Sequence, residues 1–210
     1  MRIRDHLLTA VDLAATFLLA IECAIVGIHA GLDLFGLLVL AFVGSVGGGV
    51  MRDLLLGEHP PSAFRDWRYA ALALLATAGT AVVTFAFGPV GGLTPPLTLD
   101  VFAAVGLALA ALAGTQKALD CGISSTGAII IATVNGCGGG ILRDILTAQV
   151  PHVLRADFYA TAALAGAALI VVLVRRFGVA RGRAVLAGGL VIFALRTAAL
   201  VGDWSLPHLR

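Results

Sequence analysis

Charged side chains are scarce in this sequence. Lysine, arginine, aspartate and glutamate together make up 12% of its 210 residues, about half the share found in a soluble domain. A chain of this length exposes much of its surface, and so few charges cannot cover that surface in water. The shortage excludes a soluble enzyme, a disordered protein and a secreted disulfide scaffold.

Cysteine is also rare, and the basic residues form no cluster. The three cysteines show no CxxC spacing, which argues against a disulfide framework and against a zinc site. The net charge is only +2, so nothing indicates a nucleic-acid partner. Walker, nucleophile-elbow and HExxH motifs are missing from the sequence, so we expect no enzyme activity, no cofactor and no bound metal.

Apolar residues dominate the composition instead. They make up 60% of the chain, and the mean hydropathy is +1.01. A helix that crosses a bilayer needs about 20 mostly apolar residues. The segments that meet this requirement are residues 7–28, 34–56, 69–87, 101–119, 124–146, 158–174 and 184–200. The sequence therefore predicts an all-α integral membrane protein with seven transmembrane helices in a single membrane domain, residues 1–210.

An internal repeat divides most of this domain. The sequence GGGVMRDLL at residues 47–55 recurs as GGGILRDIL at residues 138–146, an offset of 91 residues. From the first glycine onward, seven of 14 positions are identical at this offset. Each copy holds three segments (residues 7–89 and 100–174), and an odd number of crossings makes the second copy enter from the opposite side. We therefore predict two inverted three-helix repeats plus a seventh helix at 184–201, as in many transporters and channels.

Three consecutive glycines stand at the centre of each copy. Such a run weakens a helix and favours a kink, and a break would free carbonyls that lipid cannot satisfy. Carbonyls that face a water-filled cavity can replace part of a cation's hydration shell. Close helix packing is the alternative, because both copies also contain a small-xxx-small motif. We favour a pore helix, with packing as a second role, for Gly47, Gly48, Gly49, Gly138, Gly139 and Gly140.

An arginine and an aspartate follow each glycine run. Ionisable residues inside a membrane are costly and are functional candidates by default. Arg52 and Arg143 could each pair within their own repeat, or across the repeats as Arg52 with Asp144 and Arg143 with Asp53. Two roles stay open for these four residues: a structural salt-bridge clasp near the membrane surface, or control of the charge and gating of a pore.

Further polar side chains in the apolar segments are candidates for lining a pore, namely Ser45, Thr133, Asn135, Glu22 and Lys117. Glu22 could bind a cation or carry a proton, or it could be a neutral, hydrogen-bonded acid. The uncharged residues could instead bond to a neighbouring helix. For Arg196 we expect snorkelling towards the membrane surface or an ion pair with Asp203.

The doubled GGGxxRD element and the three-helix repeat resemble the prokaryotic branch of the trimeric intracellular cation (TRIC) channels. Members of the same family are also labelled as glycine transporters. Other matching segments are Lys117-Ala118-Leu119 and residues 33–36. The resemblance implies a homotrimer in a prokaryotic inner membrane. In such a trimer, each subunit holds a potassium-permeable pore bounded by the second and fifth helices, which are kinked at the glycines.

Two features stay open at this point. Nine loop arginines and lysines on the N-terminal side, against two on the other, predict an N-terminus in the cytoplasm, whereas the family resemblance implies one outside. A passive channel for monovalent cations is our first hypothesis, and a carrier for a small amino acid such as glycine is the alternative. For the subunit contact we expect the helix at 101–119, which is rich in small residues, or its repeat partner at 7–28.

Overall fold

A computed structural model describes residues 2–88, 96–154 and 159–202 of the chain. Within these ranges all regular secondary structure is helical. Six helices are long and apolar enough to cross a membrane: α1 (Arg2–His29), α2 (Leu34–Leu55), α4 (Trp67–Phe87), α6 (Pro96–Asp120), α7 (Ser125–Leu146) and α9 (Arg181–Gly202). A shorter apolar helix is α8 (Ala160–Arg175). The short helix α3 (Ser62–Arg65) and the 3-10 turn η1 (His152–Leu154) lie in the connections.

Local sequence signals set where these helices begin and end. The Asp33 carboxylate accepts a hydrogen bond from the Gly36 backbone N–H at 2.7 Å and caps α2. The Ser124 hydroxyl caps α7 in the same way, as short polar side chains do at helix N-termini. α4 stops at Gly88, whose φ of 90° suits glycine. The predicted segments therefore coincide with observed helices, whose ends differ by about five residues at most.

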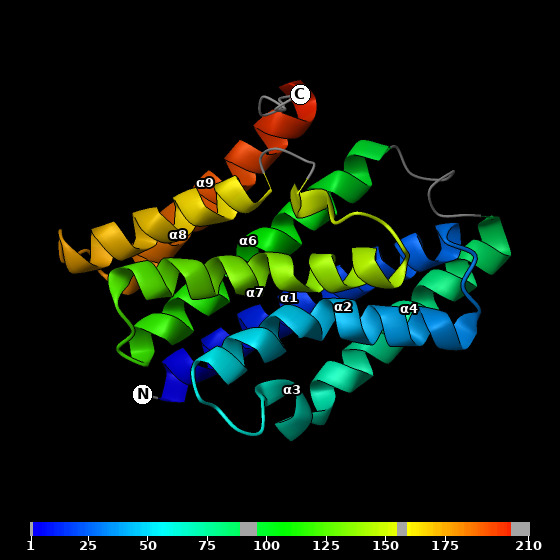
Figure 1. Cartoon of the computed structure of the whole chain (residues 1–210), viewed down its shortest axis with the longest axis horizontal. Helices are drawn as coiled ribbons and strands as arrows, with labels where there is room; N and C mark the ends of the chain where they lie inside the picture. Colours follow the sequence, from blue (N-terminus) through cyan, green and yellow to red (C-terminus); the bar gives the residue numbers. More distant parts are fainter. Residues whose placement is uncertain (1, 89–95, 155–158, 203–210) are drawn as a thin grey trace.

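The long helices run back and forth along one common direction, with α2 and α7 side by side near the centre (Figure 1). α2 and α7 point in opposite directions (Figure 1). α1 packs against α2 and α6, and α4 packs against α1 and α2. On the other side, α6 packs against α7 and α9, and α8 packs against α9 and α7. The α2–α7 pair is therefore covered by helices on both sides.

Residues 101–120 of α6 are almost completely enclosed by neighbouring helices. Between residues 101 and 120 only Phe102 and Asp120 are exposed. Its alanines and glycines are packed against neighbouring helices of the same subunit, and the subunit contact through α6 or α1 stays a prediction. α1, the alternative, keeps exposed residues at helical spacing, which are Leu7, Ala10, Ala14 and Phe17.

The outer helices present apolar side chains to their surroundings. On α4, Trp67 is 78% exposed and Phe85 is 95% exposed. On α9, Leu186 and Leu190 are exposed as well. Such a surface is stable in lipid and not in water, which agrees with a membrane-embedded protein.

Candidate functional site

α2 and α7 touch each other through their backbones. A Cβ atom on Gly48 would overlap the carbonyl oxygen of Asn135, and a Cβ on Gly139 would overlap the carbonyl oxygen of Gly44. Gly44 lies opposite Gly139, and Gly48, four residues later on α2, lies opposite Asn135, four residues earlier on α7. This is the pairing of two antiparallel helices. Because the opposing atoms belong to the backbone, neither can rotate away. Only glycine fits at these two positions.

The glycine runs do not interrupt the helices. α2 is α-helical from Leu34 to Leu55 and α7 from Ser125 to Leu146. We expected a break in each helix to free backbone carbonyls. Instead, the carbonyls along both glycine runs remain part of the helix. The effect of the glycines that the structure shows is close packing, the second of their two predicted roles.

The glycines of each run face different neighbours. Gly47 lies against the Leu142 side chain and Gly138 against the Met51 sulfur. The third glycine of each run borders polar groups instead. A Cβ on Gly49 would lie 3.7 Å from a guanidinium nitrogen of Arg52, and one on Gly140 would lie 3.6 Å from the Tyr159 hydroxyl. Beyond each crossing, therefore, α2 and α7 lead directly to charged side chains.

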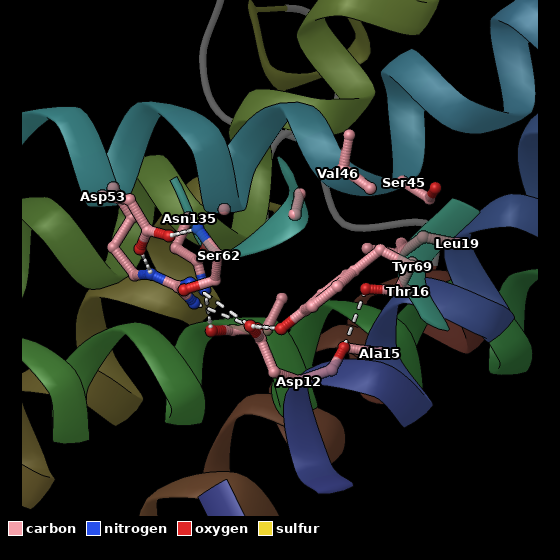
Figure 2. Close-up of a pocket in the computed structure, with 14 residues that line it drawn as sticks. Asp12, Ala15, Thr16, Leu19, Ser45, Val46, Asp53, Ser62, Tyr69 and Asn135 are labelled. Carbon is pink, nitrogen blue, oxygen red and sulfur yellow. Dashed lines mark hydrogen bonds and ion pairs between the residues drawn. The ribbon is translucent and has the colours of Figure 1, made fainter. Parts of the chain in front are cut away.

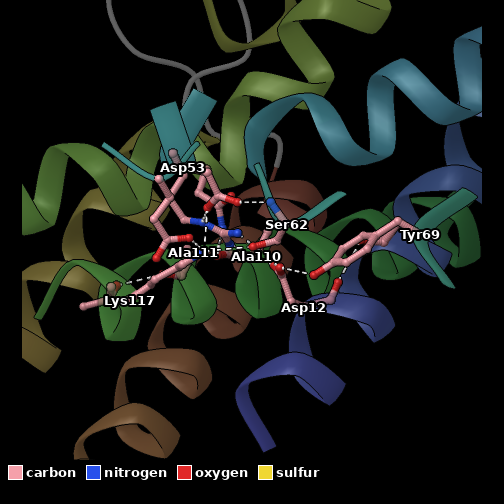
Figure 3. A network of polar contacts seen from close by, with 12 residues as sticks. Asp12, Asp53, Ser62, Tyr69, Ala110, Ala111 and Lys117 are labelled. Carbon is pink, nitrogen blue, oxygen red and sulfur yellow. Dashed lines mark hydrogen bonds and ion pairs between the residues drawn. The ribbon is translucent and has the colours of Figure 1, made fainter. Parts of the chain in front are cut away.

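Arg52 is the centre of the first group of charges, which we call the Arg52 cluster. Figure 3 shows the cluster with Asp12, Asp53 and Lys117. The Nε of Arg52 donates a hydrogen bond to Oδ1 of Asp53 at 2.7 Å. Its two terminal nitrogens bind the Asp12 carboxylate on α1 at 2.9 and 3.2 Å. The Tyr69 hydroxyl on α4 donates to the same carboxylate at 2.7 Å. Arg52 and Asp53 are both buried, so this network links three helices through buried charges.

Lys117 completes the Arg52 cluster from α6. Its ammonium group lies 2.8 Å from Oδ1 of Asp53 and 2.6 Å from the Glu58 carboxylate. It also donates to the Ser62 hydroxyl at 3.0 Å, while the Ser62 backbone N–H donates to the other oxygen of Asp53 at 2.8 Å. Asp53 thus has two cationic partners and one backbone donor.

Arg143 organises a second group of charges, the Arg143 cluster. Its Nε donates to Oδ1 of Asp144 at 2.8 Å, and a terminal nitrogen binds Glu22 of α1. The backbone N–H of His152 donates to Oδ2 of Asp144 at 2.7 Å, just as that of Ser62 does to Asp53. The two clusters differ in one respect. At the repeat offset of 91 residues, the charged Lys117 corresponds to the apolar Val26.

These contacts decide between the two pairings left open by the sequence. Each arginine pairs with the aspartate that follows it, because the long arginine side chain folds back along its own helix. Arg52 and Asp144 belong to different clusters, so the cross-repeat clasp is not formed in the part of the chain that the structure describes. Glu22 has a cationic partner in Arg143. Sequence reasoning missed Asp12 as a partner, although an aspartate inside an apolar segment was a usable signal.

Hollows adjoin both clusters. A vestibule of about 460 Å³ is lined by polar residues that include Asp12, Glu58 and Lys117. A cavity of about 10 Å³ lies between the Arg52 cluster and the glycine crossing (Figure 2). It shares four lining residues with the vestibule, namely Asp12, Arg52, Ser62 and Tyr69. At the Arg143 cluster lies a pocket of about 200 Å³, which we call the Arg143 pocket.

The candidate pore-lining residues divide into two groups. Ser45 and Asn135 line the small cavity (Figure 2), although each also bonds to a backbone carbonyl, that of Phe42 and that of Ala110. Lys117 lines the vestibule and Glu22 the Arg143 pocket. Thr133 bonds to a carbonyl of its own helix at 2.9 Å and lines none of these three hollows.

Two other sequence expectations concern metal ions and Arg196. Within the described ranges, no group of three or more histidine, cysteine, aspartate or glutamate side chains is arranged to hold a metal. Arg196 lies over the ring of Tyr159, 5.0 Å from its centre. Asp203, the partner that we expected for Arg196, lies outside the described residues.

A family model described as "Glycine transporter" matches residues 9–87 and 100–175. The chain belongs to this family. A UPF0126 membrane protein of Deinococcus radiodurans is 38% identical over 187 residues, covering 88% of this chain and 84% of the relative. The UPF0126 inner membrane protein YadS of Escherichia coli (strain K12) is 31% identical over 196 residues, 93% of either chain. The apolar helices and these relatives show that the protein is an integral protein of the bacterial inner membrane.

Solved structures extend the relationship to TRIC channels. The TRIC orthologue from Rhodobacter sphaeroides is 34% identical, with a TM-score of 0.84 over 94% of this chain and 99% of that one. A structure described as "Structural basis for conductance through TRIC cation channels" is 30% identical, with a TM-score of 0.84 over 96% of this chain and 97% of that one. The fold is that of the TRIC channels, so the resemblance inferred from the doubled GGGxxRD element is confirmed.

Proposed function

We propose that this protein is a potassium-permeable cation channel, a homotrimer in which each subunit holds its own pore. The observation that carries the proposal is the pair of hollowed, charged clusters at opposite ends of the α2–α7 crossing within one subunit. The cation-channel likeness of its structural relatives supports the same function.

Two inverted three-helix repeats give the simplest description of the pore. α2 and α7 carry the repeated sequence, run in opposite directions and end in clusters with the same arginine–aspartate–backbone geometry. In this arrangement α8 crosses the membrane as the third helix of the second repeat, and α9 is the seventh crossing. The pore then lies along α2 and α7, with the Arg52 vestibule at one mouth and the Arg143 pocket at the other.

The charges at both mouths suit a cation. In the Arg52 cluster, the cations of Arg52 and Lys117 face three carboxylates, those of Asp12, Asp53 and Glu58. In the Arg143 cluster one arginine faces the two carboxylates of Glu22 and Asp144. Each group has a formal charge of −1, which raises the local concentration of cations. No TVGYG-type filter occurs in the sequence, so discrimination among monovalent cations is expected to be modest.

The described conformation is closed. The cavity of about 10 Å³ beside the crossing has room for about one water molecule, and the Arg52 side chain lines both this cavity and the vestibule. Opening requires Arg52 to exchange partners or the α2–α7 contact to shift. A closed centre between two hollows also fits a carrier that opens to each side in turn, which keeps glycine transport as the alternative function.

Cys121 offers a direct test of the vestibule. It is exposed and lines the vestibule, whereas Cys23 and Cys137 are buried. A cationic methanethiosulfonate reagent should therefore modify Cys121 and lower the potassium conductance by about twofold or more, because it adds a positive charge at the mouth. Partial burial is the main cause that raises the pKa of the Cys121 thiol, and the nearby Glu58 carboxylate raises it further. The thiolate is the reactive form, so modification should be faster at higher pH.

Single-channel recording with the reagent on one side at a time is the measurement. Cys121→Ser should conduct normally and be insensitive to the reagent. An N-terminus in the cytoplasm places Cys121 on the cytoplasmic side, since it follows the fourth predicted crossing. Complete modification of Cys121, verified by mass spectrometry, without any change in current would show that cations do not pass through this vestibule.

A further inference from the structure

The Arg143 pocket contains an arginine that the ion pathway does not use. Arg196 enters this pocket from α9, next to Tyr159 and Glu22. α9 lies outside the two sequence repeats, and the Arg52 vestibule receives no residue from it. The appended helix therefore adds a cationic group to this mouth, whereas the additional cations of the vestibule, Arg65, Arg68 and Lys117, come from other helices.

Arg196 differs from the two cluster arginines in what its Nε–H meets. Arg52 and Arg143 each donate this hydrogen to the aspartate that follows them in the sequence. Arg196 is followed by Thr197. Its Nε is buried and donates to no acceptor among the residues that the structure describes. A buried donor without an acceptor is destabilising and rare in proteins, so this position favours a ligand that supplies an oxygen.

No described neighbour in the pocket supplies that oxygen, although the Asp100 carboxylate of α6 also lines the pocket. Glu22 is bound to Arg143, whose Nε is in turn bound to Asp144. Tyr159 offers Arg196 the face of its ring, 5.0 Å away. An aromatic face stabilises the positive charge but leaves the N–H free to bind an anion.

Apart from Asp100, the part of the pocket lining that comes from α6 is apolar, as are three of the four lining residues of α1. These apolar residues, which we call the apolar wall, are Ile21, Ile25 and Val26 on α1 and Phe102 and Ala103 on α6. The volume of about 200 Å³ is several times the roughly 30 Å³ occupied by a water molecule in the liquid. The pocket is thus large enough for an oxyanion together with a short apolar chain.

We propose that the Arg143 pocket binds an amphiphilic oxyanion, with its carboxylate or phosphate oxygen on the Nε–H of Arg196 and its apolar chain along the α1 wall. A planar guanidinium suits both kinds of oxyanion. The ligand comes either from the headgroup and upper chain of an anionic lipid or from a small free carboxylate. The proposal concerns binding alone and does not depend on whether the protein conducts ions.

Two binding measurements on the full-length protein separate the sources. The first is calorimetric titration with hexanoate in a non-ionic detergent. The second is native mass spectrometry after incubation with phosphatidylglycerol or phosphatidylcholine. For the probe that binds, Arg196→Gln should weaken binding by about tenfold to 100-fold, the range expected for a hydrogen bond to a charged group. Arg196→Lys should weaken it as well, because lysine keeps the charge but not the Nε–H.

Matched variants distinguish this site from general charge attraction. Arg183→Gln removes one arginine from an exposed position of the same helix and should leave binding unchanged. Val26→Phe narrows the pocket at its apolar wall and leaves Arg196 unchanged, so it should weaken binding. This variant tests the pocket independently if Arg196→Gln fails to fold. Hexanoate binding points to a free carboxylate, and selective retention of phosphatidylglycerol points to a lipid. If neither probe binds, or if Arg183→Gln weakens binding as much as the pocket variants do, the site does not exist.

Discussion

Gly139→Ala is expected to destabilise the protein severely, although it adds only one methyl group. The new Cβ would overlap the carbonyl oxygen of Gly44. Overpacking a core typically costs about 1–3 kcal/mol, and we expect the upper end of this range or more because two backbones must separate. Gly48→Ala should behave in the same way, since its Cβ would overlap the carbonyl oxygen of Asn135. The measurement is the thermal midpoint in detergent, together with the yield of folded protein.

Gly79→Ala is the matched control. Gly79 lies within α4, and a Cβ there would meet nothing within 4 Å. Alanine is favoured over glycine inside a helix by roughly 0.5–1 kcal/mol, so this variant should be as stable as the parent or slightly more so. Equal stability of Gly139→Ala and Gly79→Ala would mean that the two helices are not in backbone contact.

The second large effect is expected at Arg143. Arg143→Gln leaves the carboxylates of Glu22 and Asp144 without their arginine, and breaking a buried ion pair costs about 3–5 kcal/mol. Arg52→Gln should cost less, because Lys117 still neutralises Asp53 and Tyr69 still donates to Asp12. Thermal unfolding of both variants in the same detergent measures the difference.

Double-mutant cycles identify the partners. Combining Arg143→Gln with Glu22→Gln should cost less than the sum of the single changes, with a coupling of about 1 kcal/mol or more. Asp12→Asn combined with Arg143→Gln is the control cycle, and it should be additive because the two residues belong to different clusters. The pairing described above is wrong if the first cycle is additive or the control cycle is strongly coupled.

The sequence was sufficient to predict the helices and to single out residues 47–53 and 138–144, which lie at and beside the contact between α2 and α7. Apolar length determines where helices form in a membrane protein, and the repeat marked the segments that meet at the centre. The consequence of the glycines was harder to predict, because a run of glycines permits both a break and a close contact. Only the facing backbone, the Gly44 carbonyl at Gly139 for example, shows which of the two occurs.

The ion-pair partners could not be predicted from local sequence. Asp12 is 40 residues from Arg52, and Glu22 is 121 residues from Arg143. Their contacts depend on how α1 is rotated against α2 and α7, and that rotation is set by packing of the whole bundle. The same dependence applies to α6, since alanines and glycines suit contacts within a subunit as well as contacts between subunits.

Recording from the purified protein in a planar bilayer under a KCl gradient tests the proposed function most directly. A cation pathway through each subunit gives stepwise currents whose reversal potential is shifted from zero towards the potassium equilibrium potential. A cationic reagent at Cys121 reduces these currents. A bilayer that contains folded trimers but shows no current steps, while the same preparation in liposomes takes up glycine slowly and saturably, would contradict the channel and establish a carrier instead.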